Sequence, residues 1–424
     1  MQASTKGNPY QIISLPNGLR IAYLRVKGTR LFHAGFTINT GSKDDDHLPG
    51  LAHCLEHMLF KGTTTRKTIH VLNRMESVGG EINAFTTKDL TSIYGTSTSN
   101  HYGKLIDILC DVIFRSTIPS QELSKEKKVI VDEINMYLDT PEENIYDEFQ
   151  EQIFGNHPLA HNILGTPESV NTIEQKDLLR FIEKHYQFNN MVFSVVGNIS
   201  LERVVSMLEK FLPESPKLMD NNKVNKINYQ PFTAIPAFQI EKKTDYNQAY
   251  AMIGCYAYEL QHPKRWSLLL LNHLLGGPSM NSRLNLAIRE KYGYTYNVES
   301  GYAAFDETGL FHCFVGSEPK YIHKSVSLIF KELEKLRTYP LGSIQLSRAK
   351  NQYIGQITVA NESRTGLMIH MGQSLIKKGY IQPLQETIQA IQSVTTSNIL
   401  DTANELLLPE NFSSLLYLPD AETS

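Results

Sequence analysis

The chain has 424 residues, of which 41% are hydrophobic and 20% charged, so it can bury large cores and is not intrinsically disordered. This length is typical of two or three domains. The 41 Lys and Arg residues against 44 Asp and Glu residues give a net charge of −3, which argues against nucleic acid as a partner. The 4 cysteines include no CxxC pair, which argues against a disulfide framework or a cysteine zinc site and favours a reducing compartment.

The sequence gives no sign of a membrane or export segment. No apolar run precedes Pro9, so we expect no signal peptide and a cytoplasmic location. The most apolar stretch, residues 268–275, is interrupted by Asn272 and His273 and is far shorter than the roughly 20 residues that a membrane helix needs. We therefore expect a soluble protein with no membrane partner.

The N-terminal half alternates between strand and helix patterns. It opens with a predicted hairpin around the Pro-Asn-Gly turn at 16–18, and Leu51, Leu55 and Met58 recur at three- and four-residue steps that predict a helix. Thr140 with the proline after it forms a further helix start. The predicted strands are 11–15, 20–26, 32–40, 81–87, 92–97 and 191–196, and the predicted helices are 50–60, 69–78, 102–114, 121–138 and 201–211.

The C-terminal half follows a linker-like stretch at 212–231 that is rich in Pro, Lys, Asn and Asp. Predicted strands are 237–241, 249–258, 294–304, 309–315 and 412–418, with helices near 264–275 and 282–291 and more helices up to about 407. The halves share this order of elements, and segment 75–79 aligns with 289–293, although chance explains those letters nearly as well. We predict an α+β protein of two similar domains, each a mostly antiparallel sheet packed with helices, at 1–215 and 236–424, joined by a linker at 216–235.

The residues that most strongly indicate chemistry are His53, Glu56 and His57, in the order H-x-x-E-H of the inverted zincins. Histidines four residues apart share one helix face and can bind one metal ion, and a neighbouring carboxylate can take a proton from water whose pKa zinc has lowered. With 14 histidines in the chain, two can also flank a glutamate without binding metal. The helical context and Gly50 favour the metal site.

A catalytic zinc site needs a third protein ligand and an open position for water. Glu133, in the predicted helix 121–138, is the best candidate, and Glu126, two turns earlier on the same face, is suited to orient a ligand histidine. Glu122 and Asp132 lie on the same helix, and a solvated acidic face explains all of these carboxylates equally well. Spacing alone does not choose among them.

Together with this motif, segments 41–45 and 50–63 resemble the pitrilysin, insulinase and mitochondrial-processing-peptidase family of zinc metallopeptidases, in its two-domain bacterial form. Other segments that resemble the family are 15–20, 83–86, 157–159, 164–166, 190–198, 275–277, 282–284 and 288–296. The resemblance implies two domains that form half of a clamshell and one Zn2+ per chain. It assigns His53, His57 and Glu133 as metal ligands, Glu56 as the general base and Glu126 as a supporting carboxylate.

The resemblance also implies substrate contacts for residues whose context is otherwise unremarkable. Arg289 and Tyr296 would engage the substrate, since a guanidinium binds a carbonyl or carboxylate and a phenol stabilises an oxyanion; unaided, they look like a helix-surface residue and a strand aromatic. Asn83, Ala84 and Phe85 would lie on an edge strand to which an extended peptide adds, although a plain half-buried strand has the same pattern.

The function that follows is a zinc-dependent endopeptidase that cleaves peptides or unfolded segments inside a dimeric chamber. A homodimer is expected, with Arg289 and Tyr296 of one chain serving the zinc of the other, although a related partner subunit is possible. The alternatives are a non-catalytic structural or peptide-binding subunit and a maturation protease dedicated to one precursor. Cys54 is expected to point away from the metal, yet a reactive thiol so close to it would make activity sensitive to oxidation.

Overall fold

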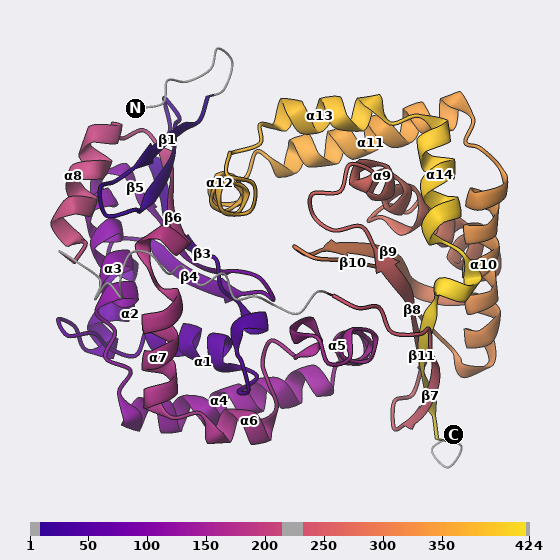
Figure 1. Ribbon diagram of the computed structural model, residues 1–424, viewed down its shortest axis with the longest axis horizontal. Helices are drawn as coiled ribbons and strands as arrows, with labels where there is room; N and C mark the ends of the chain where they lie inside the picture. The colour runs from indigo at the N-terminus through magenta and orange to yellow at the C-terminus, as the bar shows by residue number, and fades with distance from the viewer. Residues whose placement is uncertain (1–8, 214–231, 421–424) are drawn as a thin grey trace. The chain divides into compact units, whose positions relative to one another are not determined.

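The computed structural model describes residues 9–213 and 232–420, which form two compact units (Figure 1). The described segments of the first unit are 9–135, 161–213 and 359–383, and those of the second are 136–160, 232–358 and 384–420. Most of the linker expected at 216–235 lies outside the described residues. The boundary between domains at 1–215 and 236–424 therefore stays a prediction.

The first unit is built on a six-stranded sheet in the order β1-β2-β6-β3-β5-β4, in which only β2 and β6 are parallel neighbours. The strands are β1 (Gln11–Ser14), β2 (Arg20–Arg25), β3 (Leu31–Ile38), β4 (Glu81–Thr86), β5 (Thr91–Thr98) and β6 (Met191–Gly197). Among the described strands, β4 pairs with β5 alone, so it is an edge strand of this sheet. It carries Asn83, Ala84 and Phe85.

Helices cover both faces of this sheet. Successive side chains of β3 point to opposite sides, so they contact helices on different faces. Phe36 packs on Phe114 of α3, with ring centroids 5.6 Å apart. On the other face, a Cβ on Gly372 of α12 would lie 2.5 Å from the hydroxyl of Thr37, so a small residue is needed there. The helices wholly or mostly in this unit are α1 (Leu51–Leu59), α2 (Thr68–Glu76), α3 (Tyr102–Phe114), α4 (Ser120–Leu138), α6 (Pro167–Thr172), α7 (Gln175–His185), α8 (Leu201–Phe211) and α12 (Arg364–Lys378).

The second unit is built on a five-stranded sheet in the order β7-β11-β8-β10-β9, in which only β7 and β11 are parallel neighbours. Its strands are β7 (Gln239–Thr244), β8 (Ala249–Ala257), β9 (Thr295–Ala304), β10 (Gly309–Ser317) and β11 (Ser413–Pro419). Its helices are α5 (Pro141–Phe154), α9 (Arg265–Gly276), α10 (Ile322–Thr338), α11 (Ser343–Ala360, mostly in this unit), α13 (Leu384–Ser393) and α14 (Thr396–Leu406).

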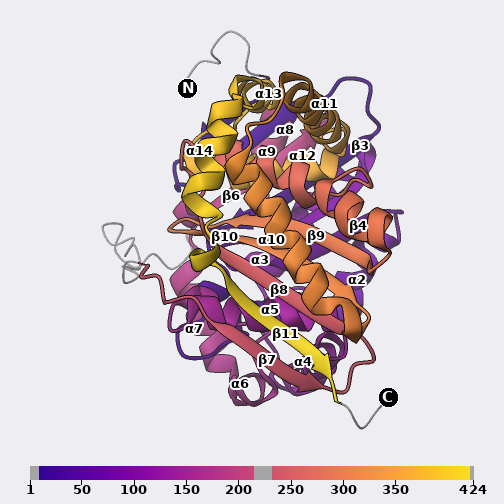
Figure 2. The same cartoon turned by 90° about the vertical axis from the view of Figure 1, so that its right-hand side faces the viewer.

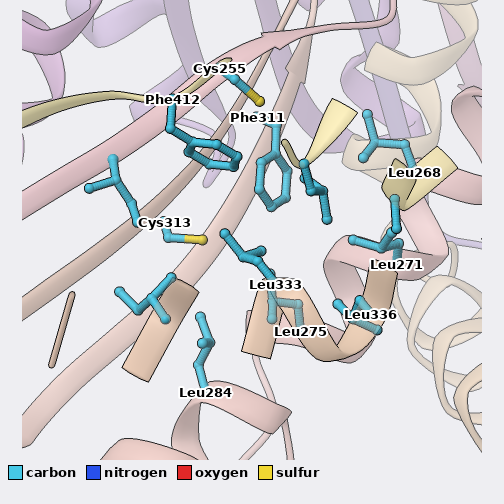
Figure 3. Packing of buried hydrophobic residues seen from close by; sticks show 14 of the residues in the cluster. Cys255, Leu268, Leu271, Leu275, Leu284, Phe311, Cys313, Leu333, Leu336 and Phe412 are labelled. Atoms are coloured by element: carbon cyan, nitrogen blue, oxygen red, sulfur yellow. The ribbon is translucent and has the colours of Figure 1, made fainter. Parts of the chain in front are cut away.

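The sheet of the second unit is also buried on both faces. Phe311 and Cys313 of β10 lie in a core with leucines of α9 and α10 (Figure 3), and α10 lies across the strands (Figure 2). Phe314 of β10 points to the other face, where it shares a core with Phe149 of α5. Because β8 and β10 bury residues on both of their faces, this sheet needs helices on two sides.

The two sheets repeat one topology. In each, the last strand (β6 or β11) pairs in parallel with β2 or β7 on one side and antiparallel with β3 or β8 on the other. Gly79 and Gly293, which end the aligned segments 75–79 and 289–293, both have left-handed φ values (+67° and +63°) just before β4 and β9. The prediction of an α+β protein with two similar, mostly antiparallel sheets packed with helices is confirmed.

Two features of the fold could not be read from the sequence. In chain order α5 lies between β5 and β6 of the first sheet but packs on the second sheet, whereas α12 belongs to the second half and packs on the first sheet. Apolar periodicity predicts that a helix has a buried face, but not which sheet buries it. The predicted helix 282–291 is π-helical over Asn285–Glu290.

Within the described ranges, no helix is both long enough and apolar enough to cross a lipid bilayer.

Candidate metal centre

The candidate site is built on α1, whose first turn is fixed by the loop before it. The buried carboxylate of Asp45 accepts hydrogen bonds from the backbone N–H groups of Gly50 and Ala52, at 2.7 and 2.8 Å. Such bonds satisfy amides at the start of a helix, although burial raises the pKa of Asp45 well above its usual value. Gly50 has φ +90°, and a Cβ on it would lie 2.5 Å from the carbonyl oxygen of Leu164. Position 50 therefore requires glycine, and its backbone contacts fix where α1 begins.

Three side chains converge beside α1. His53 and His57 lie one helical turn apart with ring centroids separated by 4.7 Å, and their Nε2 atoms lie 3.9 and 3.5 Å from Oε2 of Glu133 on α4. One ligand atom from each of the three residues lies within 4.8 Å of the other two. Ligands of one tetrahedral zinc ion, each bound at about 2.1 Å, are roughly 3.4 Å apart. The two imidazoles and the carboxylate therefore fit a zinc ion with little movement.

Glu126 of α4 lies on the other side of His57. Its Oε2 is 3.3 Å from Nδ1 of His57, and its Oε1 forms an ion pair with Nζ of Lys61 at 2.6 Å. A carboxylate that accepts the Nδ1–H of a histidine fixes the ring and leaves Nε2 for a metal. This arrangement favours Glu133 as the third ligand and Glu126 as the residue that orients His57.

Glu56 lies between the histidine pair and the edge strand. Thr86, the last residue of β4, donates a hydrogen bond from Oγ1 to Oε2 of Glu56 at 2.6 Å. Burial raises the pKa of Glu56, and the hydroxyl of Thr86 opposes that shift. A carboxyl group with a pKa above its usual value is well suited to take a proton and return it.

The pKa values of the cluster follow from burial and from its hydrogen bonds. Burial, and then the nearby His57, lowers the pKa of His53 to about 4. Burial by itself would lower the pKa of His57, but hydrogen bonds with Glu133 and Glu126 outweigh it and raise that pKa. The hydrogen bond with His57 lowers the pKa of Glu133. Because a metal ion binds a histidine nitrogen that carries no proton, metal binding competes with protonation of His57.

Comparisons with known proteins agree with this geometry. Residues 20–167 match the family model described as insulinase (peptidase family M16), and residues 172–353 match that of the peptidase M16 inactive domain. A Bacillus subtilis protein named "Uncharacterized zinc protease YmxG" is 30% identical over 407 residues, which are 95% of this chain and 97% of that protein. This chain belongs to the M16 peptidase family.

Other M16 relatives cover nearly the same length. An uncharacterized zinc protease of Streptomyces coelicolor is 31% identical over 405 residues, 93% of this chain and 86% of that protein. The crystal structure of a protease from Helicobacter pylori has a TM-score of 0.88 at 20% identity and covers 97% of this chain and 99% of that chain. A Pseudomonas fluorescens structure described as a peptidase M16 inactive domain has a TM-score of 0.87, also at 20% identity, and covers 97% of this chain and 98% of that one. These structural matches show the fold alone.

The predicted site residues of this M16 chain fall into two groups. One group lies in the first unit and comprises His53, Glu56, His57, Glu126 and Glu133, with Asn83, Ala84 and Phe85 on β4. The alternative carboxylates lie apart from it, since Glu122 pairs with Lys125 at 2.7 Å and Asp132 is exposed. The other group is in the second unit: Arg289 lies in the π-helical turn, and Tyr296 on β9 is 89% exposed.

Two contacts of the M16 site were missed in the sequence, although Lys61 and Thr86 both lie in segments that resemble the family. Lys61 forms an ion pair with Glu126, and Thr86 donates a hydrogen bond to Glu56. Each contact joins residues far apart along the chain, and no spacing rule predicts such a pair.

The reactivity expected of Cys54 is not supported. The thiol is completely buried, and burial raises its pKa to about 12, so it stays protonated at neutral pH. A buried, protonated thiol is a poor target for oxidants despite its place beside His53.

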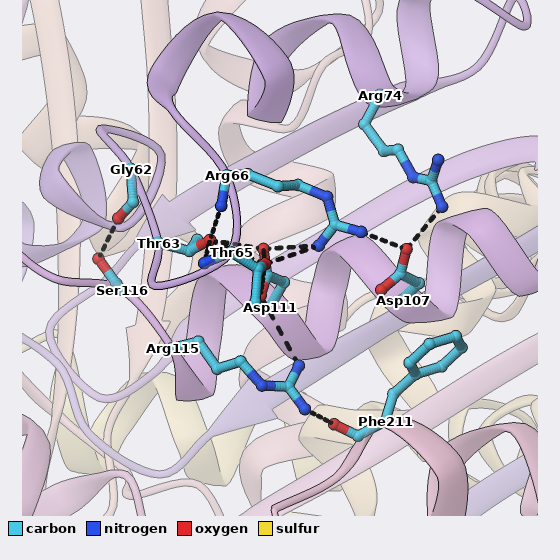
Figure 4. A network of polar contacts seen from close by, with 10 residues as sticks. All are labelled: Gly62, Thr63, Thr65, Arg66, Arg74, Asp107, Asp111, Arg115, Ser116 and Phe211. Atoms are coloured by element: carbon cyan, nitrogen blue, oxygen red, sulfur yellow. Dashed lines mark hydrogen bonds and ion pairs between the residues drawn. The ribbon is translucent and has the colours of Figure 1, made fainter.

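A polar network holds the segment after α1, which carries Lys61 (Figure 4). The fully buried carboxylate of Asp111 on α3 accepts hydrogen bonds from Thr63 Oγ1 and Arg66 Nη1, both at 2.7 Å. Burial would raise the pKa of Asp111, but these hydrogen bonds outweigh it and lower the pKa. Further members of the network are Thr65, Arg74, Asp107 and Arg115. The network ties the segment behind the metal centre to α2 and α3.

Proposed function

We propose that this M16 family member is a zinc-dependent endopeptidase that cleaves peptides or unfolded segments. The observation that carries the proposal is the convergence of His53, His57 and Glu133, with the carboxylate of Glu56 in contact with the last residue of an edge strand. Two histidines and one carboxylate leave a position open on zinc, as hydrolysis requires. A base beside them, at an edge to which a peptide can add, fits peptide-bond hydrolysis.

Each side chain has a distinct role in this proposal. A zinc ion held by His53, His57 and Glu133 would supply a Lewis acid that polarises the scissile carbonyl and lowers the pKa of the attacking water. Glu56 takes the proton of that water and returns it to the leaving amine. Glu126 accepts the Nδ1–H of His57 and keeps the ring turned toward Glu133.

The proposed binding site for the peptide is the free edge of β4. Unpaired N–H and C=O groups of an edge strand can pair with an extended peptide, which joins the sheet as another strand. Because side chains alternate along β4, Ala84 shares a face with Thr86, which contacts Glu56, while Asn83 and Phe85 point to the opposite face. A peptide added along Asn83, Ala84 and Phe85 therefore passes the base at the end of β4.

Arg289 and Tyr296 are proposed to act on a second copy of this chain. Within the described residues Arg289 has no ion-pair partner, and Tyr296 is 89% exposed, so both are free to bind a substrate carbonyl or an oxyanion. The proposal is a homodimer in which this pair completes the partner's site, with a related partner chain as the alternative. Mixing Glu56→Gln chains with Arg289→Ala chains should restore activity through one competent site per dimer; no recovery would contradict it.

The test of the proposed function is cleavage of a peptide library by the zinc-loaded protein, with fragments identified by mass spectrometry. Glu56→Gln serves as the control because it removes the base and keeps the shape of the side chain. Cuts in many unrelated peptides that disappear in the control support a general endopeptidase. No cuts by well-folded, zinc-bearing wild type would contradict it and favour a dedicated maturation protease or a non-catalytic subunit.

A further inference from the structure

One hydrogen bond ties the side chain of Glu56 to a residue outside its own helix. Within residues 9–213 and 232–420, the only hydrogen bond to its side chain comes from Thr86 Oγ1, at 2.6 Å from Oε2. A hydroxyl that donates to a carboxylate at this distance makes a strong, charge-assisted bond. Because Oε2 is engaged, the other carboxylate oxygen is left for the proton of a water molecule.

Thr86 is itself fixed in place by the backbone around it. It lies opposite Thr91 at the end of the β4–β5 pair, and the next residue, Thr87, donates its N–H to Leu90 O and accepts from the N–H of Ser42 at 2.8 and 3.0 Å. Threonine is also stiff at χ1, since it branches at Cβ. Its hydroxyl therefore has a well-defined position from which to hold Glu56.

We propose that Thr86 is a positioning residue that orients Glu56 and couples it to the strand to which substrate adds; this inference rests on the proposed function. The base lies on α1 and the peptide would lie along β4, which are separate elements of the first unit. The Thr86–Glu56 bond joins them, so it sets the place of the carboxylate relative to a peptide paired with β4. No other hydrogen bond to Glu56 within the described chain supplies this link.

The test compares Thr86→Val, which keeps the shape of the side chain but loses the hydroxyl, with Thr86→Ser, which keeps the hydroxyl. Misplacement of a catalytic group costs up to about a hundredfold in rate. Thr86→Val should therefore lower kcat by roughly ten- to a hundredfold with little change in KM or zinc content, and Thr86→Ser should recover most of the loss. Thr98→Val is the matched control, since Thr98 is exposed on β5 of the same sheet, and should behave as wild type.

A second comparison separates positioning from a structural effect. If Thr86 acts through Glu56, adding Thr86→Val to Glu56→Gln should change the residual rate very little. Unchanged kcat in Thr86→Val, or a Thr86→Ser variant as slow as Thr86→Val, would overturn the inference. Thr86→Ala replaces the valine variant if that one fails to fold. Wild type that cuts no peptide would refute the proposed function, whereas wild type and Thr86→Val that cut equally well would refute this inference alone.

Discussion

Replacing Glu126 by glutamine removes the negative charge behind His57 and keeps the size of the side chain. Glu126 lies 3.3 Å from Nδ1 of His57 and 2.6 Å from Nζ of Lys61, and its side chain is only 9% exposed. Loss of such a partner of a ligand histidine costs about 10- to 100-fold in metal affinity, which is about 1.4–2.7 kcal/mol. We expect Glu126→Gln to weaken zinc binding by this factor, and Glu133→Gln, which replaces a proposed anionic ligand by a neutral amide, to weaken it more.

Competition between the protein and a chelator of known zinc affinity measures this difference at fixed pH. Glu122→Gln is the matched control, because Glu122 lies on the same helix but pairs with Lys125 on the surface, and it should bind zinc as wild type does. Wild-type affinity in Glu126→Gln would refute the orienting role. A large loss in Glu126→Gln with none in Glu133→Gln would show that the roles of the two carboxylates are reversed.

Three further predictions concern stability and reactivity. Asp111→Asn leaves the guanidinium of Arg66 with a weakened partner in a buried network and should cost about 3 kcal/mol, seen as a lower midpoint in denaturant unfolding; an unchanged midpoint would contradict the role of the network. Cys54 should resist alkylation at pH 8 until denaturant is added, because it is buried and its pKa is about 12; rapid labelling of the native thiol would show that α1 opens readily. In the metal-free protein His53 has a pKa of about 4, against 6.5 in the unfolded chain. Because the unfolded chain binds this proton first as pH drops, the free energy of unfolding should fall between about pH 6.5 and about pH 4. His53→Gln should lose this part of the pH dependence, and an identical pH profile in that variant would contradict the assignment.

Much of the fold was predictable because local patterns decide where elements lie. The helices 102–114 and 201–211 were predicted to the residue, since their apolar positions recur with helical spacing and are bounded by polar loops. The similarity of segments 75–79 and 289–293 did not distinguish a repeat from chance; the structure shows that both segments end in a glycine with left-handed φ just before an edge strand. The exchange of α5 and α12 was not predictable, because it depends on which sheet offers a complementary surface.

The candidate site likewise contains residues that a local pattern predicts and contacts that depend on how the elements pack. His53, Glu56 and His57 were predicted as a group because helical spacing brings them onto neighbouring positions of one helix. Spacing alone could not choose between Glu126 and Glu133, because both lie on one helix; the family resemblance assigned their roles, and in the structure their positions relative to His57 distinguish them. The contact of Thr86 with Glu56 depends on how β4 packs beside α1, which no local pattern encodes.

We propose that one zinc ion at His53, His57 and Glu133 supports peptide cleavage with Glu56 as the base. The most direct test measures zinc content and peptide cleavage on the same preparation, before chelation, after chelation and after stepwise return of zinc. Cleavage should be lost with the metal and should return in proportion to zinc, up to one ion per chain. Glu56→Gln should bind the same one ion but cut no peptide. Cleavage that survives chelation, or that persists in Glu56→Gln, would contradict it.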